Sequence, residues 1–307
     1  MYRIGIDVGG TNIAMGVVDS ELHIIKKNSI KTKEASEPEA MIAAIAQGVK
    51  DLMAKARITE SEIESIGVGV PGTAELDTGR ILYANNLGFE EVPFLPKLRT
   101  ALGEPLGSRT FFDNDANAAA IGEYVAGKYN VPVFVMVTLG TGIGGGIIIG
   151  GKVLRGLNYA AAEFGHMSIN IDGCDCNCGR KGCFEDYASA TALTEMAKEA
   201  GMPEYTDGES FFAAVKDGDE TANKVLDEFV YYLSEGLTNL INILQPDVLV
   251  LSGGITRAAD LFLDKVRERV YRDVYSRSSA KNTEIRIASG IPDAGDVGII
   301  GAALISE

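Results

Sequence analysis

The chain has 307 residues, of which 46% are hydrophobic and 23% are charged. This composition is typical of a globular protein of about two domains, and it excludes a disordered, collagen-like or coiled-coil chain. Lys and Arg total 28 whereas Asp and Glu total 43, and the resulting net charge of −15 argues against binding to nucleic acid or to anionic lipid.

No segment of the sequence predicts a membrane or secretory destination. No apolar run reaches the ~18 residues that a bilayer-spanning helix needs. The N-terminal stretch MYRIGIDVGG lacks the basic start and the long apolar core of a signal peptide. We therefore expect a cytoplasmic protein without a membrane partner.

The first predicted element is an N-terminal β-hairpin, in which two apolar strands flank a turn rich in glycine. The turn contains Asp7, Gly9, Gly10, Thr11 and Asn12. Paired glycines let a backbone turn without Cβ strain and come close to a phosphate, and a carboxylate at a strand end can hold Mg²⁺ through water. The turn is therefore a candidate phosphate site, with an ordinary hairpin turn as the alternative.

A helix and then a buried strand are predicted next. Apolar residues recur on one helical face from Met41 to Met53, in a segment that opens at Pro38. The apolar stretch at 63–72 predicts a strand that ends in a Pro-Gly turn at Gly72. Strands that alternate with helices indicate an α/β fold.

Acids and amides are concentrated at a predicted strand-to-helix junction: Asp113, Asn114, Asp115 and Asn117. Any one of them could be a helix N-cap. A carboxylate beside an alcohol and a γ-phosphoryl group is what phosphorylation of a hydroxyl requires, with a neighbouring amide to orient the sugar. Paired-carboxylate glycoside hydrolysis is the alternative, but it leaves the phosphate-type turns without a purpose. We place the domain boundary near 115–125.

A second glycine-rich hairpin follows. Its turn region contains six Gly and Thr residues: Gly140, Thr141, Gly142, Gly144, Gly145 and Gly146. Glycines at a strand turn are costly unless something must come close, and a nucleotide phosphate is the natural candidate. The pattern is neither a Walker nor a Rossmann motif, because no Gly-Lys-Ser/Thr follows and the next element is a strand.

The four cysteines of the chain fall within ten residues: Cys174, Cys176, Cys178 and Cys183. Thiols clustered in this way indicate a metal site rather than a disulfide framework. His166 with the last three thiols would form a closed tetrahedral Zn²⁺ site, and an all-cysteine site is the competing assignment. The flanking carboxylates of Glu163 and Glu185 accept hydrogen bonds only, which suits the hydroxyls of a sugar.

The last predicted elements repeat the earlier pattern. A long apolar stripe from Val225 to Leu244 predicts a helix that Pro246 closes. An apolar strand then ends at Gly253 and Gly254, where the turn would suit the floor of an adenine or ribose pocket, and residues 262–275 form a third amphipathic stretch. A glycine-rich hairpin and a later apolar strand therefore occur twice along the chain, which suggests that one α/β unit is present twice.

In this order, the motifs resemble the ROK family of sugar kinases and sugar-responsive repressors, and within it the zinc-containing bacterial glucokinases. The resemblance covers nearly the whole chain. Its most specific part is Gly165-His166-Met167 followed by the run from Cys176 to Glu185. The resemblance implies that Zn²⁺ is structural and that its ligands are His166, Cys176, Cys178 and Cys183, with Cys174 as a spare thiol.

The resemblance also implies the fold. Members have the duplicated actin-like, RNase H-like ATPase fold, with two α/β domains flanking a cleft. We expect a small N-terminal domain over 1–116, completed by a C-terminal helix at 294–307, and a large domain over 117–293 that carries the zinc loop. A homodimer or higher homo-oligomer is implied by the resemblance alone.

The implied activity is transfer of a phosphoryl group from ATP, with Mg²⁺, to the 6-hydroxyl of a hexose, glucose in the first place. Asp115 would be the catalytic base. The residues implied to bind the sugar are Gly72, Asn86, Asn114, Asp115, Glu163, His166 and Glu185. The residues implied to bind ATP are Asp7, Gly9, Gly10, Thr11, Asn12, Gly140, Thr141, Gly142, Gly253 and Gly254.

Three other functions remain open from the sequence. A kinase of this family could act on N-acetylmannosamine, N-acetylglucosamine, allose or fructose, since residues that bind hydroxyls are shared. A non-catalytic sugar sensor would need a DNA-binding segment before the first turn, where we expect no room for one, and the net charge also opposes it. A cytoskeletal or chaperone ATPase is disfavoured by the sugar-type carboxylates and the zinc loop.

Overall fold

The computed structural model describes residues 1–205, 207–291 and 294–305. The chain forms two compact units. Unit 1 contains Met1–Tyr129, Val153–Ala161 and the C-terminal stretch from Ser289, and unit 2 contains Asn130–Lys152 and Ala162–Ala288. Each unit buries its own hydrophobic core. No helix in the described part of the chain is long and apolar enough to cross a membrane.

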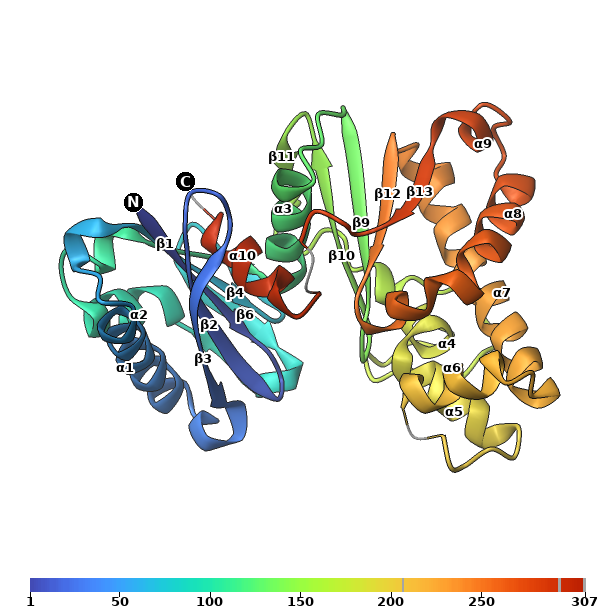
Figure 1. Ribbon diagram of the computed structural model, residues 1–307, viewed down its shortest axis with the longest axis horizontal. Coiled ribbons are helices and arrows are strands. Elements are labelled where there is room, and N and C mark those ends of the chain that lie inside the picture. The colour runs from blue at the N-terminus through green and yellow to red at the C-terminus, as the bar shows by residue number, and fades with distance from the viewer. Residues whose placement is uncertain (206, 292–293, 306–307) are drawn as a thin grey trace. The chain divides into compact units, whose positions relative to one another are not determined.

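Unit 1 is built on a sheet with the strand order β3-β2-β1-β4-β8. Its strands are β1 (Tyr2–Val8), β2 (Asn12–Val18), β3 (Ile24–Lys31), β4 (Ile63–Val70) and β8 (Thr110–Asn114). A small second sheet contains β5 (Thr73–Glu75), β6 (Arg80–Ala84) and β7 (Phe89–Val92). The helices are α1 (Pro38–Ala56), α2 (Phe94–Leu102), α3 (Asp115–Ala126) and α10 (Val297–Ala303). Figure 1 shows α1 and α2 side by side.

The second five-stranded sheet has the order β11-β10-β9-β12-β13. Its strands are β9 (Val133–Leu139), β10 (Ile143–Ile149), β11 (Lys152–Val153), β12 (Val248–Ser252) and β13 (Glu284–Ile287). The helices of unit 2 are α4 (Glu185–Ala188), α5 (Ala190–Glu199), α6 (Gly208–Lys216), α7 (Glu220–Leu244), α8 (Leu263–Asp273) and α9 (Ser279–Asn282).

The two sheets repeat one topology, as the sequence predicts. In each, an antiparallel hairpin (β1 with β2, β9 with β10) is followed by parallel pairing to the next strand and to the one after it. The two glycine-rich turns occupy equivalent places, between the first and second strands. The duplication therefore puts both candidate phosphate turns at the carboxyl end of the first strand of a sheet.

The long helices follow the predicted patterns closely. Helix α1 begins with Pro38 at its first position, where the missing N–H costs nothing. Helix α7 begins five residues before the apolar stripe, because the side chain of Asp219 accepts hydrogen bonds from the N–H groups of Thr221 and Ala222 and caps the helix there. It ends before Gln245, whose left-handed conformation closes the last turn.

Helix α10 lies directly on the backbone of β1 and β4. A Cβ atom on Gly5 would lie 1.8 Å from the carbonyl oxygen of Ile299, and one on Gly67 would lie 1.8 Å from that of Ala302. Gly5 and Gly67 are register partners on the two strands. Only glycine permits so close an approach, so the two positions together seat the helix on the sheet.

Helix α3 packs on α10 at another pair of glycines. A Cβ atom on Gly122 would lie 2.8 Å from the Cα atom of Gly301. Helix α3 therefore belongs to unit 1, which continues to Tyr129. The sequence pattern predicts a boundary after residue 116, whereas unit 1 extends to Tyr129. The packing of α3 on α10 leaves no mark in the local pattern.

The chain leaves unit 1 after Tyr129 and returns to it for the last time at Ser289, and a buried carboxylate connects these two points. Glu123 is fully buried on α3. Its carboxylate accepts hydrogen bonds from the N–H of Ser289 at 2.9 Å, the N–H of Gly290 at 3.1 Å and the hydroxyl of Tyr129 at 3.2 Å. Since these donors satisfy both oxygens, helix α3 fixes both chain ends.

Candidate active site and metal centre

The first glycine-rich turn, between β1 and β2, is held by its own backbone and by one threonine. The N–H of Gly9 donates to the carbonyl oxygen of Asn12 at 3.0 Å. Thr32 donates its hydroxyl to the carbonyl oxygen of Gly9 at 2.7 Å and its N–H to that of Thr11 at 3.0 Å. Gly10 and Thr11 stay exposed. The turn is therefore rigid, while its middle is open to a ligand.

Asp7 lies near the carboxyl end of β1 beside the start of α10. A Cβ atom on Gly298 would lie 2.1 Å from Asp7 Oδ2, so the glycine makes room for the carboxylate. Burial raises the pKa of Asp7 above its usual value. A nearby cation would favour the ionised form, so this carboxyl fits a site for Mg²⁺ that arrives with phosphate.

The structure distinguishes the two acids at the start of α3. Asp113 is buried, with 1% of its surface exposed. One oxygen accepts from the N–H of Asn114 and from Nδ2 of Asn117, and the other accepts from Arg155. Because both oxygens are taken, Asp113 has no free acceptor for a substrate proton, and its contacts indicate a structural role.

Asp115 is the first residue of α3 and is half-buried. Asn114 caps the helix by accepting hydrogen bonds from the N–H groups of Ala116 and Asn117. A Cβ atom on Gly69 would lie 3.3 Å from the Cα atom of Asp115, and Gly69 is the register partner of Asp7. The structure therefore brings Asp7, Asn114 and Asp115 together at the carboxyl ends of adjacent parallel strands, where α/β folds bind ligands.

Gly72 is joined to this group and Asn86 is not. Nδ2 of Asn114 donates to the carbonyl oxygen of Gly72 at 3.1 Å. Gly72 has a φ of 81°, and a Cβ atom there would lie 2.1 Å from the carbonyl oxygen of Tyr83, so glycine is required. Asn86 is exposed in a 3₁₀ turn, and within the described ranges no hydrogen bond links its side chain to the other predicted residues.

In unit 2, the two remaining turns lie against each other. Gly253 has a φ of 102°, and a Cβ atom there would lie 2.3 Å from the carbonyl oxygen of Leu139, the residue before Gly140. Thr191 donates its hydroxyl to the carbonyl oxygen of Thr141 at 2.7 Å. The N–H of Ala190 donates to the carbonyl oxygen of Gly140 at 2.8 Å. The start of α5 therefore fixes the turn of residues 140–142.

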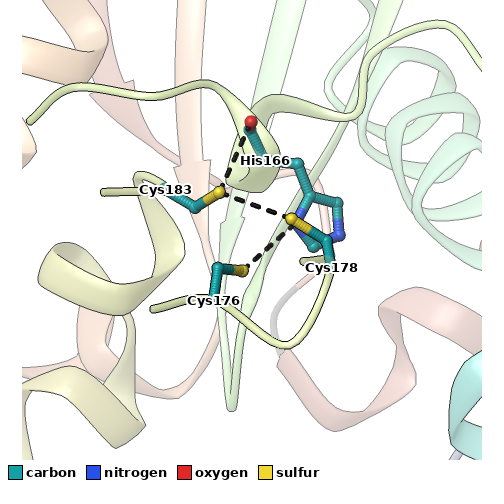
Figure 2. A group of neighbouring side chains, drawn as sticks. All are labelled: His166, Cys176, Cys178 and Cys183. Carbon is teal, nitrogen blue, oxygen red and sulfur yellow. Dashed lines mark hydrogen bonds between the residues drawn. The ribbon is translucent and has the colours of Figure 1, made fainter. Parts of the chain in front are cut away.

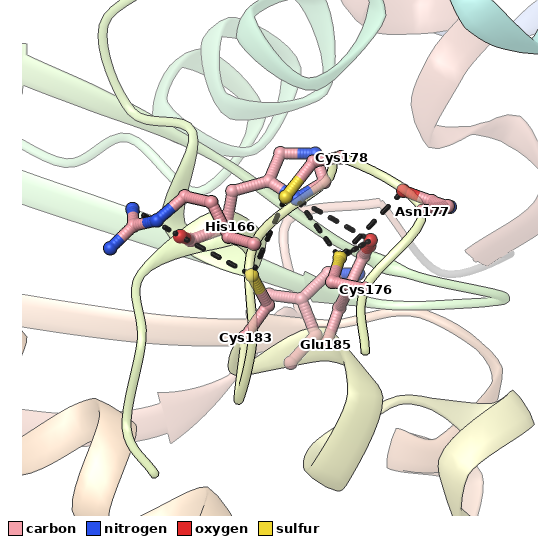
Figure 3. A network of polar contacts seen from close by, with 8 residues as sticks. His166, Cys176, Asn177, Cys178, Cys183 and Glu185 are labelled. Carbon is pink, nitrogen blue, oxygen red and sulfur yellow. Dashed lines mark hydrogen bonds and ion pairs between the residues drawn. The ribbon is translucent and has the colours of Figure 1, made fainter. Parts of the chain in front are cut away.

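Glu185 connects the second glycine-rich turn to the cysteine cluster. Its Oε2 accepts from the N–H of Ile143 at 3.3 Å, and a Cβ atom on Gly142 would lie 2.4 Å from that oxygen. Its Oε1 lies 3.6 Å from Nδ1 of His166 and 3.9 Å from Sγ of Cys176. Figure 3 shows this carboxylate beside the imidazole and the thiols. One side chain therefore touches both a candidate phosphate turn and a candidate metal site.

The candidate metal centre is formed by one imidazole and three thiols (Figure 2). The ligand atoms of His166, Cys176, Cys178 and Cys183 all lie within 4.8 Å of one another. Sγ of Cys178 and Cys183 are 3.6 Å apart, and Sγ of Cys176 is 3.8 Å from Nδ1 of His166. Ligand atoms around a tetrahedral Zn²⁺ lie ~3.5–3.8 Å apart. The cluster therefore fits Zn²⁺.

The three thiols of the cluster differ in pKa. Burial raises the pKa of the Cys176 and Cys183 thiols, whereas a hydrogen bond from the backbone of Arg180 lowers that of Cys178. Bound Zn²⁺ would have to displace protons from the buried pair, so its affinity falls with falling pH. Cys174 is exposed and lies outside the group of four.

Glu163 precedes the 3₁₀ turn Phe164–His166. Removal of water by the surrounding protein raises the pKa of its carboxyl, and the negative charge of Glu185 raises it further, while His166 acts in the opposite direction. His166 lies beside both acids, because its N–H donates to the carbonyl oxygen of Glu163 at 3.2 Å and its Nδ1 lies 3.6 Å from Oε1 of Glu185. The three residues form a polar group in unit 2 with acceptors on two carboxylates.

Three residues that hold the site carry no signal in the local sequence. Thr32, Thr191 and Arg155 are each remote in sequence from what they bind, and a lone Thr or Arg gives no local signal. Asp113 was visible within the acidic motif, but only its burial and its contacts separate its role from that of Asp115.

The comparisons with known proteins agree with this geometry. The ROK family model matches residues 3–307. The glucokinase of Halalkalibacterium halodurans is 34% identical over 97% of this chain and 93% of its own length. The N-acetyl-D-glucosamine kinase of Salmonella heidelberg is 31% identical over 98% of each chain.

Solved structures give the same result. The crystal structure of a ROK family glucokinase from Streptomyces griseus, in complex with glucose and AMPPNP, aligns with a TM-score of 0.82 and 32% identity over 99% of this chain and 98% of that one. The chain belongs to the ROK family. Its two α/β units have the actin-like ATPase fold that the motifs predict.

Proposed function

We propose that this protein is an ATP-dependent hexose kinase that transfers the γ-phosphoryl group to the 6-hydroxyl of glucose. The observation that carries the proposal is the position of Glu185, which touches the turn of residues 140–142 on one side and His166 on the other. The candidate phosphate turn and the group of residues proposed to bind the sugar therefore share one residue. The full-length likeness to kinases of glucose and N-acetyl-D-glucosamine supports the same class of reaction.

The chain would hold ATP by its glycine-rich turns. Backbone N–H groups at Gly9–Asn12 and Gly140–Gly142 would donate to phosphate oxygens, as such concave turns do in phosphate sites. Asp7 would hold Mg²⁺ carried in by the nucleotide, and Mg²⁺ neutralises developing charge on the phosphates. The turn at Gly253 and Gly254 would support the nucleoside. Because these donors are mostly backbone groups, an acidic chain can bind an anion.

The sugar would be held by acceptors and activated by a base. Glu163, Glu185 and His166 would bind hydroxyls, and the resemblance assigns the same role to Asn114, Gly72 and Asn86. Asp115 would accept the proton of the 6-hydroxyl while the hydroxyl oxygen attacks the γ-phosphorus in line and ADP leaves. We do not assign this role to Asp113, because the ion pair with Arg155 and the hydrogen bonds from Asn114 and Asn117 hold its two oxygens in a structural contact.

Zn²⁺ would be structural and held by His166, Cys176, Cys178 and Cys183. Bound Zn²⁺ supplies a rigid four-way link between the segment of His166 and the cysteine loop. Nδ1 of His166 is the nitrogen that faces the thiols, which leaves Nε2 for a sugar hydroxyl. A cytoplasmic location and a homodimer or higher homo-oligomer remain predictions from the sequence and its resemblance.

A panel of hexoses with ATP and Mg²⁺ tests the proposal, with ADP release as the measurement. We expect the highest kcat/KM for glucose and no phosphorylation of 6-deoxyglucose, which lacks the reacting hydroxyl. Preference for N-acetylglucosamine, N-acetylmannosamine, allose or fructose would change the substrate and keep the mechanism. Sugar binding without turnover of any hexose would refute the kinase and favour a sensor.

The glycine at position 10 offers a sharper test of the phosphate turn. A Cβ atom on Gly10 would meet no atom within 4 Å, so the fold does not require glycine there. We expect Gly10→Ala to keep the melting temperature of the wild type but to raise the KM for ATP by about 10-fold, which corresponds to ~1.4 kcal/mol. The added methyl group would obstruct the approach of the phosphate to the backbone.

Gly208→Ala is the matched control for this variant. Gly208 begins α6 and a Cβ atom there would make only ordinary contacts, 3.8 Å from Phe212. Neither the melting temperature nor the KM for ATP should change in the control. An unchanged KM for ATP in Gly10→Ala would remove Gly10 from the proposed phosphate site.

A further inference from the structure

The segment Val153–Ala161 interrupts unit 2 in the sequence but belongs to unit 1. We call these residues the strap. The strap is closed on itself, because the N–H of Ala161 donates to the carbonyl oxygen of Arg155 at 3.0 Å. At its end, the chain returns to unit 2 one residue before Glu163. The strap therefore leads directly to a carboxylate of the proposed sugar site.

An ion pair between Arg155 of the strap and Asp113 holds the strap in unit 1. Nε of Arg155 donates to Oδ2 of Asp113 at 2.8 Å, and Nη2 lies 2.6 Å from the same oxygen. The side chain of Asp113 is 2% exposed and that of Arg155 is 27% exposed. Tyr159 on the strap lies close enough to Asp77 in unit 1 for this carboxylate to raise the pKa of its hydroxyl. Loss of either partner of a buried pair is far more costly than loss of a surface pair.

The other oxygen of Asp113 holds the first turn of α3. It accepts from the N–H of Asn114 at 2.8 Å and from Nδ2 of Asn117 at 3.1 Å. These two residues flank Asp115 in the sequence. The hydrogen bonds therefore form a chain from Arg155 through Asp113 to the residues on both sides of the proposed base.

We propose that Arg155 is a positioning residue for phosphoryl transfer, which it assists by orienting Asp115 through Asp113. This inference rests on the proposed function, because it gives Asp115 the role of base. Without the guanidinium, Asp113 would be a buried carboxylate lacking its cation. The hydrogen bonds that it accepts from Asn114 and Asn117 would then change in geometry. A displacement of a catalytic group by about 1 Å can lower a rate by ~100-fold.

Arg155→Ala tests the proposal by kinetics. We expect kcat to fall by about 10- to 100-fold, with the KM for ATP unchanged, because Arg155 does not belong to the phosphate turns. Arg155→Lys keeps the charge but loses the forked geometry, so its kcat should lie between those of the wild type and Arg155→Ala. Adding Asp113→Asn to Arg155→Ala should cost little more, because the two residues act as one unit.

Arg99→Ala is the matched control, because Arg99 on α2 holds the strand β8 that also carries Asp113. Nε and Nη2 of Arg99 donate to the carbonyl oxygen of Thr110 at 3.1 and 2.8 Å, at the start of the strand that carries Asp113. This variant loses a similar pair of hydrogen bonds that has no link to Asp115. It should lower the melting temperature without lowering kcat.

Hydrogen exchange at the first turn of α3 separates positioning from direct contact with substrate. We expect the N–H groups of Ala116 and Asn117, which Asn114 caps, to exchange faster in Arg155→Ala than in the wild type or Arg99→Ala. A lower kcat with unchanged exchange would assign Arg155 to the substrate instead and overturn the proposal. Faster exchange with unchanged kcat would also overturn it. A wild type that phosphorylates no hexose would refute the proposed function itself, before any variant is compared.

Discussion

Asp115→Asn is expected to lower kcat by about 10²- to 10⁴-fold, the range by which a positioned general base accelerates proton transfer. The amide keeps the size of the side chain but cannot accept the proton of the sugar hydroxyl. Binding of glucose should persist in part, because Glu163, His166 and Glu185 are untouched. Steady-state kinetics with glucose and ATP, together with calorimetric titration of glucose, measure both effects.

Stability provides the check that the fold is intact. Asp115 is half-buried at the first turn of α3, and the cap of that helix is the neighbouring Asn114. The melting temperature of Asp115→Asn should therefore stay within a few degrees of the wild type. Asp51→Asn is the matched control, since Asp51 is an exposed acid on α1 that bonds only to Gln47 among the described contacts. The control should keep full kcat.

A residual kcat above about one tenth of the wild-type value in Asp115→Asn would exclude this residue as the base. Asp113 would not be the next candidate, because both of its oxygens are occupied. Glu163 would then have to be tested, because Oε2 of Glu185 accepts from the N–H of Ile143 and its Oε1 lies beside His166.

The repeated fold could be predicted from the sequence because its signals are local. Each hairpin has two apolar strands around a glycine turn, and each long helix shows an apolar face with a proline at one end. The cysteine cluster is equally visible, since all four thiols lie within ten residues. The fit of His166 rather than Cys174 to the group of four comes from the resemblance, and the distances among the ligand atoms agree with it.

The parts that could not be predicted depend on contacts between distant segments. The strap is short, polar in part and without periodicity, and its contacts with unit 1, among them the ion pair of Arg155 with Asp113, assign it there. The extent of unit 1 to Tyr129 depends on the glycine contact between α3 and α10. Gly5 and Gly67 lie inside strands, and the sequence alone does not reveal that the backbone of α10 packs against them.

Removal of the proposed Zn²⁺ should have the largest effect on stability. The segment from Cys174 to Arg180 is held by few backbone hydrogen bonds, among them Cys176 N–H to Arg180 at 2.8 Å and Gly182 N–H to Cys174 at 2.8 Å. In Cys183→Ala, we expect zinc content to fall from about one ion per chain to near zero and the melting temperature to fall by roughly 5–10 °C. Elemental analysis and thermal unfolding measure the two changes.

Glucose binding should be lost along with the metal, because the cluster sets the orientation of the sugar-type residues. Nδ1 of His166 lies 3.8 Å from Sγ of Cys176, and Glu185 contacts both residues. Once the link among these side chains is gone, the imidazole can rotate away from a sugar hydroxyl. Binding of ATP should weaken less than that of glucose, because the turn Gly9–Asn12 belongs to unit 1, whereas the turn of residues 140–142 is connected to the cluster through Glu185. The expected signature is therefore loss of glucose affinity with a smaller loss of nucleotide affinity.

Cys174→Ser is the matched control and decides between the two ligand sets. Cys174 is exposed and lies outside the group of four, so this variant should keep its zinc, its melting temperature and its activity. If Cys174→Ser instead lost the ion while His166→Ala retained it, the site would be the all-cysteine alternative, and His166 would be free to serve the sugar with both nitrogens. If Cys183→Ala retained a full equivalent of zinc, neither set would hold. The His-Cys₃ site requires loss in both Cys183→Ala and His166→Ala, because a tetrahedral ion held by three thiolates and one imidazole uses all four.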